Sequence, residues 1–180
     1  MTQPGILAFI ILGLLNEKPM SGYDVRRLFR DTPLKSYSDS PGATYPALRS
    51  LEKRKFVQGR TDASTPLRPK RVFRVTPAGR DALIQWLREP VRAVENSRHA
   101  GEFEAKLAFM SDLLSREEAI ALTREYASAV REHLHVVRAY EADHEAQLSR
   151  SARLALHGGV VRLEATLKWL EDVNRGLRTR

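Results

Sequence analysis

Residues 40–57 read SPGATYPALRSLEKRKFV, and this stretch decides how the rest of the chain is interpreted. Ser40 is a good N-cap and Pro41 suits the first helical position, so a helix is predicted to start here. Gly59 follows closely enough to end the region. Pro46 has no backbone N–H to bond to the preceding turn, so we expect a kink close to the start of the helix.

The two faces of this helix differ in chemistry. Leu48 and Leu51 fall on one face with Thr44 beside them, which predicts an anchored side. The opposite face is small and basic, and it consists of Gly42, Arg49, Ser50 and Lys53. Taken alone, the stretch is equally consistent with an ordinary surface helix whose cationic face is solvated.

Two segments rich in β-forming residues follow the helix, at residues 57–61 and 71–76. The segment between them, DASTPLRPK at residues 62–70, is rich in turn residues and basic at its end. A helix followed by a basic hairpin is the layout of a winged helix-turn-helix. In that fold the helix enters the major groove, and the hairpin, or wing, reaches phosphates or the minor groove.

Further helices are expected on both sides of this stretch. The run ILAFIILGLL from Ile6 is apolar nearly all round, which predicts a helix buried on more than one side, with an outer face that meets another subunit. Ser21 can cap a second helix. The polar connection PLKSYSDS at residues 33–40 is expected to be extended. Thr76 followed by proline predicts a fourth helix after the wing.

The order and spacing of several motifs resemble the DNA-binding domain of PadR-type transcriptional regulators. Three stretches carry the resemblance: MSGYDVRRLF at 20–29, GATYPALRSLEKRKFV at 42–57 and PKRVFRVTPAGRDAL at 69–83. That family shares a glycine–tyrosine pair in its second helix and a tyrosine–proline pair in its recognition helix. It also shares a threonine, proline or glutamate, and glycine run after the wing. The matching residues here are Gly22 and Tyr23, Tyr45 and Pro46, and Thr76, Pro77 and Gly79.

The resemblance implies a DNA-binding set drawn from three elements. The recognition helix and its start contribute the residues nearest the bases and the DNA backbone: Ser40, Thr44, Tyr45, Arg49 and Lys53. The wing contributes residues that would hold phosphates: Arg68, Lys70 and Arg71. The start of the second helix would fix the other edge of the interface through Ser21 and Tyr23. The chain departs from the family at Ala43, where many members have serine, and this leaves the base preference open.

The charge of the chain is unevenly distributed. The net charge is +8, and the first 90 residues hold 16 Lys and Arg against 8 Asp and Glu, whereas residues 91–180 hold 14 of each kind. Much of the excess surrounds the expected recognition helix and wing. A localised basic patch is the electrostatic footprint of nucleic-acid binding, and a merely solubilising surface is the alternative.

The composition also indicates a compartment. The chain of 180 residues has no cysteine, so it offers neither a disulfide framework nor thiolate chemistry, which fits a reducing environment. The apolar run at residues 6–15 lacks a basic leader and a cleavage site, and it is too short to span a bilayer. We therefore expect a cytoplasmic protein without a membrane segment.

The second half is expected to be all helical, after a domain boundary in the polar stretch at residues 90–101. Ser115 followed by Glu118 is a capping box, which predicts a long helix that ends near Ser149. The sequence therefore predicts a mainly α fold. A winged helix-turn-helix DNA-binding domain over residues 1–90 would precede an all-helical dimerisation domain over residues 91–180.

The last helix carries an apolar seam with spacings of three and four: Leu156, Val160, Leu163, Leu167, Leu170 and Leu177. Because nothing in so small a domain is expected to close this seam, pairing between subunits is favoured over an intramolecular antiparallel bundle. LALHGGVVRLEATLKWLEDV at residues 154–173 is similar to the last helix of the virulence-activator-like C-terminal domain of one PadR subgroup. That resemblance implies a homodimer held by this domain and by the first helix, through Ile6, Phe9 and Ile10.

No catalytic, metal or cofactor site is expected. Glu132 with His135 and Glu141 with His144 have Glu-x-x-His spacing, but both pairs lie on one expected helix, whereas di-iron sites need the motif on two helices. No glycine-rich phosphate loop, nucleophile elbow or paired catalytic carboxylate stands out. We therefore do not expect an enzyme.

The sequence is interpreted as a sequence-specific transcriptional regulator, a repressor, that binds palindromic double-stranded DNA as a homodimer. An alternative from another class is a winged-helix interaction module whose basic face binds an acidic protein partner. A third hypothesis, compatible with the first, is a ligand sensor in which a small-molecule effector relieves repression. The resemblance to the wider family implies this hypothesis.

Overall fold

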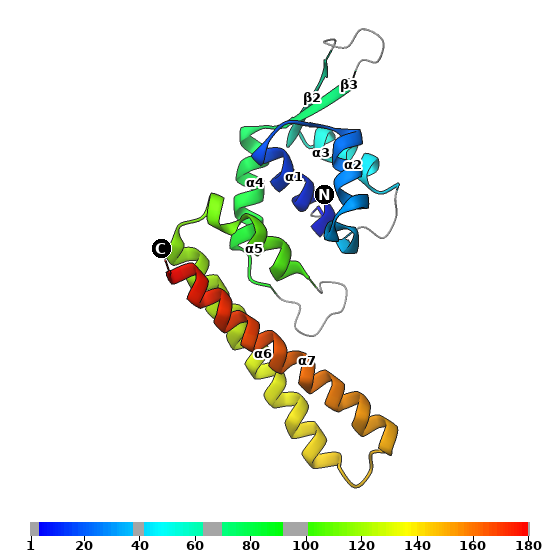
Figure 1. Ribbon diagram of the computed structural model, residues 1–180, viewed down its shortest axis with the longest axis vertical. Helices are drawn as coiled ribbons and strands as arrows, with labels where there is room; N and C mark the ends of the chain where they lie inside the picture. Colours follow the sequence, from blue (N-terminus) through cyan, green and yellow to red (C-terminus); the bar gives the residue numbers. More distant parts are fainter. Residues whose placement is uncertain (1–3, 38–41, 63–69, 92–100, 180) are drawn as a thin grey trace. The chain divides into compact units, whose positions relative to one another are not determined.

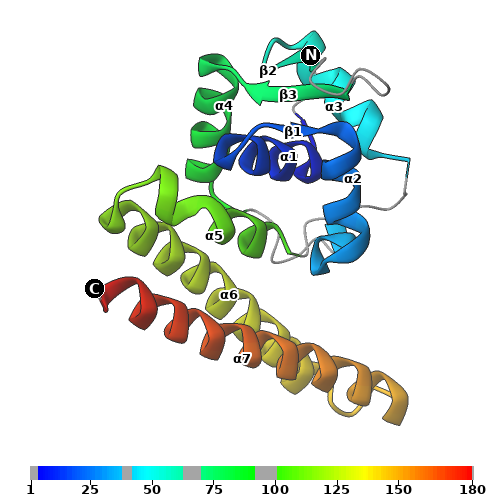
Figure 2. The same ribbon diagram turned by 45° about the horizontal axis from the view of Figure 1, so that its top comes forward.

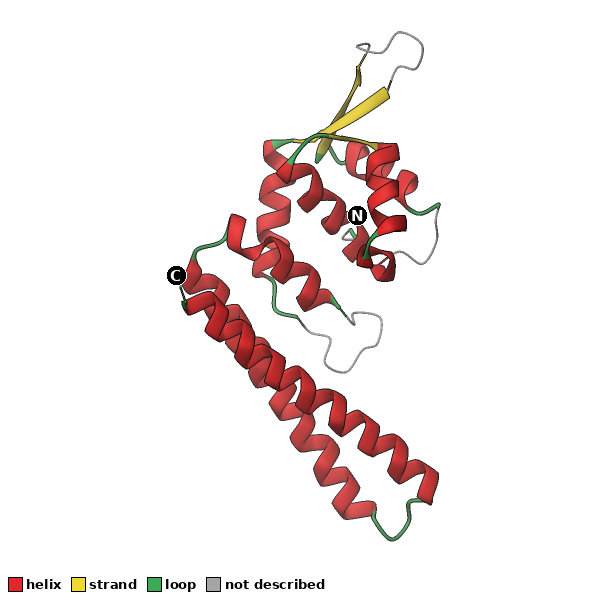
Figure 3. Cartoon of the chain, in the orientation of Figure 1, coloured by secondary structure: helices red, strands yellow, loops and turns green. Residues whose placement is uncertain are grey.

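The computed structural model describes residues 4–37, 42–62, 70–91 and 101–179 (Figure 1). The chain divides into two compact units, Met1–Glu89 and Pro90–Arg180. Within the described ranges the chain is mostly helical, and its strands belong to the first unit (Figure 3). The predicted fold class is therefore confirmed, with a winged helix-turn-helix followed by helices.

Some of the sequence-based expectations fall outside the described residues. These are the capping role of Ser40, the helical start at Pro41, the phosphate contact of Arg68 and most of the boundary stretch at residues 90–101.

The first unit contains a small antiparallel sheet among its helices. In chain order it consists of α1 (Ile6–Glu17), β1 (Met20–Ser21), α2 (Gly22–Asp31), η1 (Pro33–Tyr37), α3 (Thr44–Lys53), β2 (Val57–Asp62), β3 (Lys70–Val75) and α4 (Pro77–Arg88). The strand order is β1-β3-β2. β2 and β3 match the two predicted β segments to within one residue at each end. The sequence does not predict β1, because a strand of two residues is too short to show an alternating pattern.

Two predicted helix starts are confirmed by their caps. The Ser21 hydroxyl accepts a hydrogen bond from the Asp24 N–H at 3.2 Å and begins α2. The Thr76 hydroxyl accepts one from the Gly79 N–H at 3.1 Å and begins α4. Each cap satisfies an N–H group that has no partner inside its helix.

The connection after α2 differs from the expectation of an extended segment. Residues Pro33–Tyr37 form a 3-10 helix, η1, because the Lys35 N–H bonds back to the carbonyl of Thr32 at 3.1 Å.

α1 forms the core of the first unit and is buried nearly all round, as predicted. It packs against α3, α4 and β3, and Figure 2 shows it running between α4 and α2. Phe9 stacks on Trp86 of α4 with 4.7 Å between the ring centroids, and Ile10 is fully buried. The sequence places both side chains at a dimer interface, but the core of the unit already covers them. Ile6 alone among the three expected residues keeps partial exposure.

α3 begins at Thr44, later than the predicted start at Ser40 and Pro41. Its N-cap, Ala43, has no side-chain hydrogen bond, and its carbonyl accepts the first helical bond from Ala47 at 3.1 Å. Pro46 is therefore the third helical residue, where a backbone N–H has no partner within the helix. Proline at this position therefore removes no helical hydrogen bond, and the kink predicted near Pro46 loses its cause.

α3 ends in a turn that places Lys55 in the left-handed region, with φ of 61°. The Phe56 N–H bonds to the Leu51 carbonyl at 2.9 Å and the Lys55 N–H to the Glu52 carbonyl at 2.9 Å, which is a Schellman pattern. Gly59 does not end the region as predicted, because it lies inside β2.

The backbone of Phe56 joins α3, β3 and α4. The Thr76 N–H donates to the Phe56 carbonyl at 2.9 Å, and the Thr76 hydroxyl donates to the Lys55 carbonyl at 2.7 Å. A Cβ at Gly79 would overlap the carbonyl oxygen of Phe56 and lie 2.8 Å from its carbonyl carbon. Glycine at position 79 therefore lets α4 begin directly against the end of α3.

The second unit consists of α5 (Glu102–Leu113), α6 (Arg116–His144) and α7 (Arg150–Arg178). The predicted capping box is present, with the Ser115 hydroxyl accepting from the Glu118 N–H and the Glu118 carboxylate from the Ser115 N–H. α6 ends at His144, short of the predicted end near Ser149, which instead caps α7. Among the described residues no helix is long and apolar enough to cross a membrane.

An aromatic cluster connects the three helices of the second unit. Phe103 of α5 stacks on Tyr126 of α6 at 4.6 Å and meets Trp169 of α7 edge-on at 5.8 Å. Burial raises the pKa of the Tyr126 hydroxyl above its usual range. Beside Phe103, Lys106 is fully buried, with its ammonium 3.3 Å from the Glu102 carboxylate.

The apolar seam of α7 packs on α6 of the same chain, and the two helices form an antiparallel hairpin (Figure 1). Val160 and Leu170 are buried in this hairpin, and the other seam residues are half-buried: Leu156, Leu163, Leu167 and Leu177. The expectation that nothing within the chain closes the seam is therefore wrong. α6 is long enough to cover it, and the intramolecular antiparallel pairing left open by the sequence is the one observed.

Replacing Gly79 with alanine should destabilise the protein by about 3 kcal/mol, because the added methyl group meets backbone atoms that cannot move without breaking the Thr76 contacts. Urea unfolding followed by far-UV circular dichroism measures the change in the free energy of unfolding.

Gly176→Ala is the matched control. A Cβ at Gly176 meets no atom within 4 Å, and the residue lies in the last turn of α7. Alanine there should leave stability unchanged or raise it by up to about 0.5 kcal/mol. Equal effects of the two substitutions would contradict the steric role of Gly79.

Candidate nucleic-acid interface

The start of α2, the exposed face of α3 and the start of β3 surround one concavity of about 630 Å³. Of the ten residues predicted to bind DNA, six line it: Ser21, Tyr23, Tyr45, Arg49, Lys70 and Arg71. Leu48 and Phe73 also line it, and both are buried. The structure thus brings together residues that lie up to 50 positions apart in the sequence.

Two exposed tyrosines stand at this concavity. The exposed fraction is 55% for Tyr23 and 42% for Tyr45, although large aromatic side chains are usually buried. Gly22 allows the close approach of α2 to α3, because a Cβ at this position would lie 2.8 Å from Cε1 of Tyr45. Gly22 of the first motif and Tyr45 of the second therefore meet at one packing contact.

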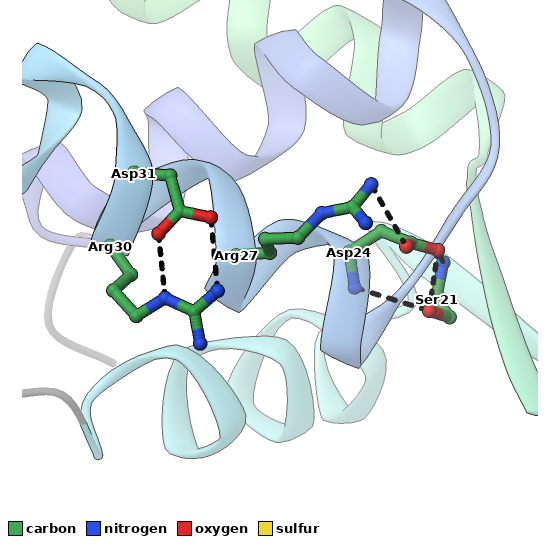
Figure 4. Close-up of polar contacts among 5 residues, drawn as sticks. All are labelled: Ser21, Asp24, Arg27, Arg30 and Asp31. Carbon is green, nitrogen blue, oxygen red and sulfur yellow. Dashed lines mark hydrogen bonds and ion pairs between the residues drawn. The ribbon is translucent and has the colours of Figure 1, made fainter.

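Ser21 is placed at the concavity but is not a free surface group. It is 4% exposed, and its hydroxyl donates to Oδ2 of Asp24 at 2.6 Å while it accepts from the Asp24 N–H (Figure 4). The hydrogen bond from Ser21 lowers the pKa of the Asp24 carboxyl below its usual value. The Ser21 side chain therefore caps α2, and its predicted contact at the edge of the DNA interface stays a prediction.

The outer face of α2 carries charged pairs (Figure 4). Arg30 donates from Nε to Oδ1 of Asp31 at 2.6 Å and from a terminal nitrogen to Oδ2 at 2.9 Å. This bidentate contact lowers the pKa of Asp31 and raises that of Arg30. Arg27 lies 3.8 Å from Asp24. These pairs hold guanidinium groups of α2 along its own surface.

Thr44 is 1% exposed, so the prediction that it lies nearest the bases is wrong. It belongs to the buried stripe with Leu48 and Leu51, at the helical spacing of four and three residues. Arg49, Lys53 and Lys70 are exposed, and Lys53 lies outside the lining of the concavity.

An acidic residue, Glu52, organises the basic surface. Its Oε1 atom accepts a hydrogen bond from Arg71 at 2.7 Å and another from the Gly59 N–H at 3.1 Å. The Arg71 guanidinium also lies over the Phe73 ring, 5.6 Å from its centroid. One carboxylate therefore links α3 to both strands of the wing.

Gly59 leaves room for the same contact. A Cβ there would lie 2.5 Å from Nε of Arg71 and 3.0 Å from Oε1 of Glu52. Glu52 is not among the residues that the sequence predicts for this surface. The available signal is a lone carboxylate, three residues after Arg49, within an otherwise basic stretch.

The two units match two family models. Residues 11–85 match the transcriptional regulator PadR-like family, and residues 102–178 match the virulence activator alpha C-terminal family. The negative transcriptional regulator PadR of Bacillus subtilis (strain 168) is 31% identical over 120 residues, which are 67% of this chain and 64% of that protein. The chain thus spans slightly less than two thirds of the length of that relative.

Solved structures of the same relative are also similar. The crystal structure of Bacillus subtilis PadR in complex with operator DNA is 26% identical, with a TM-score of 0.45, over 96% of this chain and 99% of that chain. The complex of that protein with p-coumaric acid is 26% identical, with a TM-score of 0.44 and the same shares of the two chains. From the two family matches and the curated relative, we conclude that the chain belongs to the PadR-like family of transcriptional regulators and carries a virulence activator alpha C-terminal domain.

Proposed function

We propose that this protein is a repressor that binds a palindromic DNA operator as a homodimer. The observation that carries the proposal is the convergence of Tyr45, Arg49 and Lys70 on one concavity of the unit that holds the whole net positive charge. The relative that is 31% identical is named a negative transcriptional regulator, which supports repression.

In the proposed complex α3 docks in the major groove. Arg49 projects from its exposed face and can reach base edges, whereas Lys70 begins β3 and meets phosphates beside the groove. Lys53, exposed in the last turn of α3, adds a backbone contact. The guanidinium of Arg71 is already paired with Glu52, so Arg71 contributes mainly by holding the wing to α3.

The proposed dimer forms through the second unit. Among the described residues six large apolar side chains are exposed, and four of them lie on the hairpin: Val136, Tyr140, Leu154 and Val161. Exposed apolar side chains gathered on two paired helices favour burial against another protein surface. Two copies would carry two winged units to the two half-sites of a palindrome.

Selection of bound duplexes from random DNA tests the function directly. At about 0.15 M salt, where non-specific attraction is screened, the purified protein should recover a palindrome with half-sites one or two helical turns apart. Recovery of no motif, together with tight binding to an acidic protein, would favour the interaction module instead. p-Coumaric acid, which Bacillus subtilis PadR binds, is the first compound to add as an effector.

Arg49 and Lys70 should differ in their effects on DNA binding. Arg49→Ala should weaken the selected site by about 1–3 kcal/mol and relax the base preference, because base contacts specify sequence. Lys70→Ala should weaken all DNA alike and reduce the slope of log K against log salt by about one. Fluorescence anisotropy over a salt series measures both. Lys168→Ala, exposed on α7, is the control, and identical profiles for Arg49 and Lys70 would contradict these roles.

Glu52→Gln should weaken the selected site by about 1 kcal/mol, because the amide holds Arg71 and the wing less firmly than the carboxylate does. Removal of a negative charge alone would instead strengthen binding to any DNA. Asp81→Asn, on the exposed surface of α4, is the matched control for charge. Tighter specific binding by both variants would show that Glu52 acts only as a charge.

A further inference from the structure

The second unit contains an arginine-rich groove that the DNA-binding proposal does not use. It lies between α6 and α7 and has a volume of about 450 Å³. Its lining holds one glutamate, Glu171, and four arginines: Arg124, Arg131, Arg175 and Arg178. A volume of this size accommodates a small organic or inorganic ligand. The unit as a whole carries equal numbers of basic and acidic residues, so the groove is a local concentration of positive charge.

The arginines of the groove are poorly neutralised by the protein. Arg175 pairs with Asp172 of its own helix and remains 77% exposed along its side chain. Among the described residues no carboxylate lies within ion-pair distance of Arg124, Arg131 or Arg178. Four guanidinium groups around one hollow repel one another, and an anion between them would remove that repulsion.

Asn174 provides a second, independent observation in the same groove. Its Nδ2 atom donates to the Leu170 carbonyl at 3.1 Å, which fixes the orientation of the amide. Its Oδ1 atom is buried, and no donor in the described part of the chain reaches it. A buried carbonyl oxygen without a donor is rare in native proteins, because its loss of hydration is not compensated. Ala127 and Leu167 add small or apolar surface to the same lining.

We propose that this groove binds a small oxyanion that carries its own hydrogen-bond donor. The guanidinium groups would hold the anionic oxygens through paired N–H donors, and the O–H of the ligand would donate to Oδ1 of Asn174. Hydrogenphosphate is the simplest ligand of this class, since it has both charged oxygens and one O–H. Sulfate has similar size and charge but no donor, so it satisfies the arginines and not Asn174.

Titration of the ¹⁵N-labelled protein with hydrogenphosphate and with sulfate, at mildly alkaline pH and matched ionic strength, tests the proposal. The arginine Nε–H resonances report binding at individual side chains. Hydrogenphosphate should shift the resonances of the groove arginines saturably and bind about tenfold more tightly than sulfate, which corresponds to one hydrogen bond to a charged partner.

Two substitutions of groove arginines and one substitution of Asn174 test which residues form the site. Arg131→Gln and Arg178→Gln should each weaken both anions by about tenfold, because each removes one charged pair. Asn174→Leu keeps the apolar seam and should remove the preference for hydrogenphosphate while it leaves sulfate binding unchanged. Lys70→Gln, in the first unit, is the control for phosphate binding at the DNA interface and should change neither titration at the groove.

Three results would overturn the proposal. The first is an absence of saturable shifts at the groove arginines, and the second is equal affinity for the two anions in the unaltered protein. The third concerns Arg131→Gln: the variant loses self-association in sedimentation equilibrium, while its anion titrations match those of the unaltered protein. That result would show that a second copy of the chain covers the groove.

Discussion

The first unit depends on the place where the backbone of Phe56 meets Thr76 and Gly79. At this point the end of α3, the end of β3 and the start of α4 share hydrogen bonds to consecutive carbonyl groups. The junction is possible only because residue 79 has no side chain. α4 in turn supplies Trp86, on which Phe9 of the central helix stacks. One backbone contact therefore sets the direction of α3 relative to the core.

The basic surface of this unit is ordered by a carboxylate. Lysine and arginine side chains are long, and in the absence of a partner they would sample many rotamers and hold the wing weakly. Glu52 accepts hydrogen bonds from Arg71 and from the backbone of β2, and so ties the hairpin to α3. The resulting surface has two kinds of cation: those that fix the wing, such as Arg71, and those that remain exposed, such as Arg49 and Lys70.

In the second unit few other elements are available to cover the apolar seam of the long helix α7. α6 covers the seam of α7, and the aromatic cluster around Phe103 attaches α5 to both helices. The pairing of α6 and α7 leaves two distinctive surfaces on the second unit. One is the exposed apolar set that includes Val136 and Val161, and the other is the arginine groove around Asn174.

Features that depend on neighbouring residues could be predicted from the sequence: the caps at Ser21, Thr76 and Ser115, and the two long strands. Their hydrogen bonds span only a few positions or follow from side-chain alternation. Three features could not be predicted in this way: the start of α3 at Thr44, the burial of Thr44 and Phe9, and the closure of the α7 seam by α6. Each of these depends on which distant surface covers a residue, and local spacing is the same whether that surface belongs to the same chain or to another.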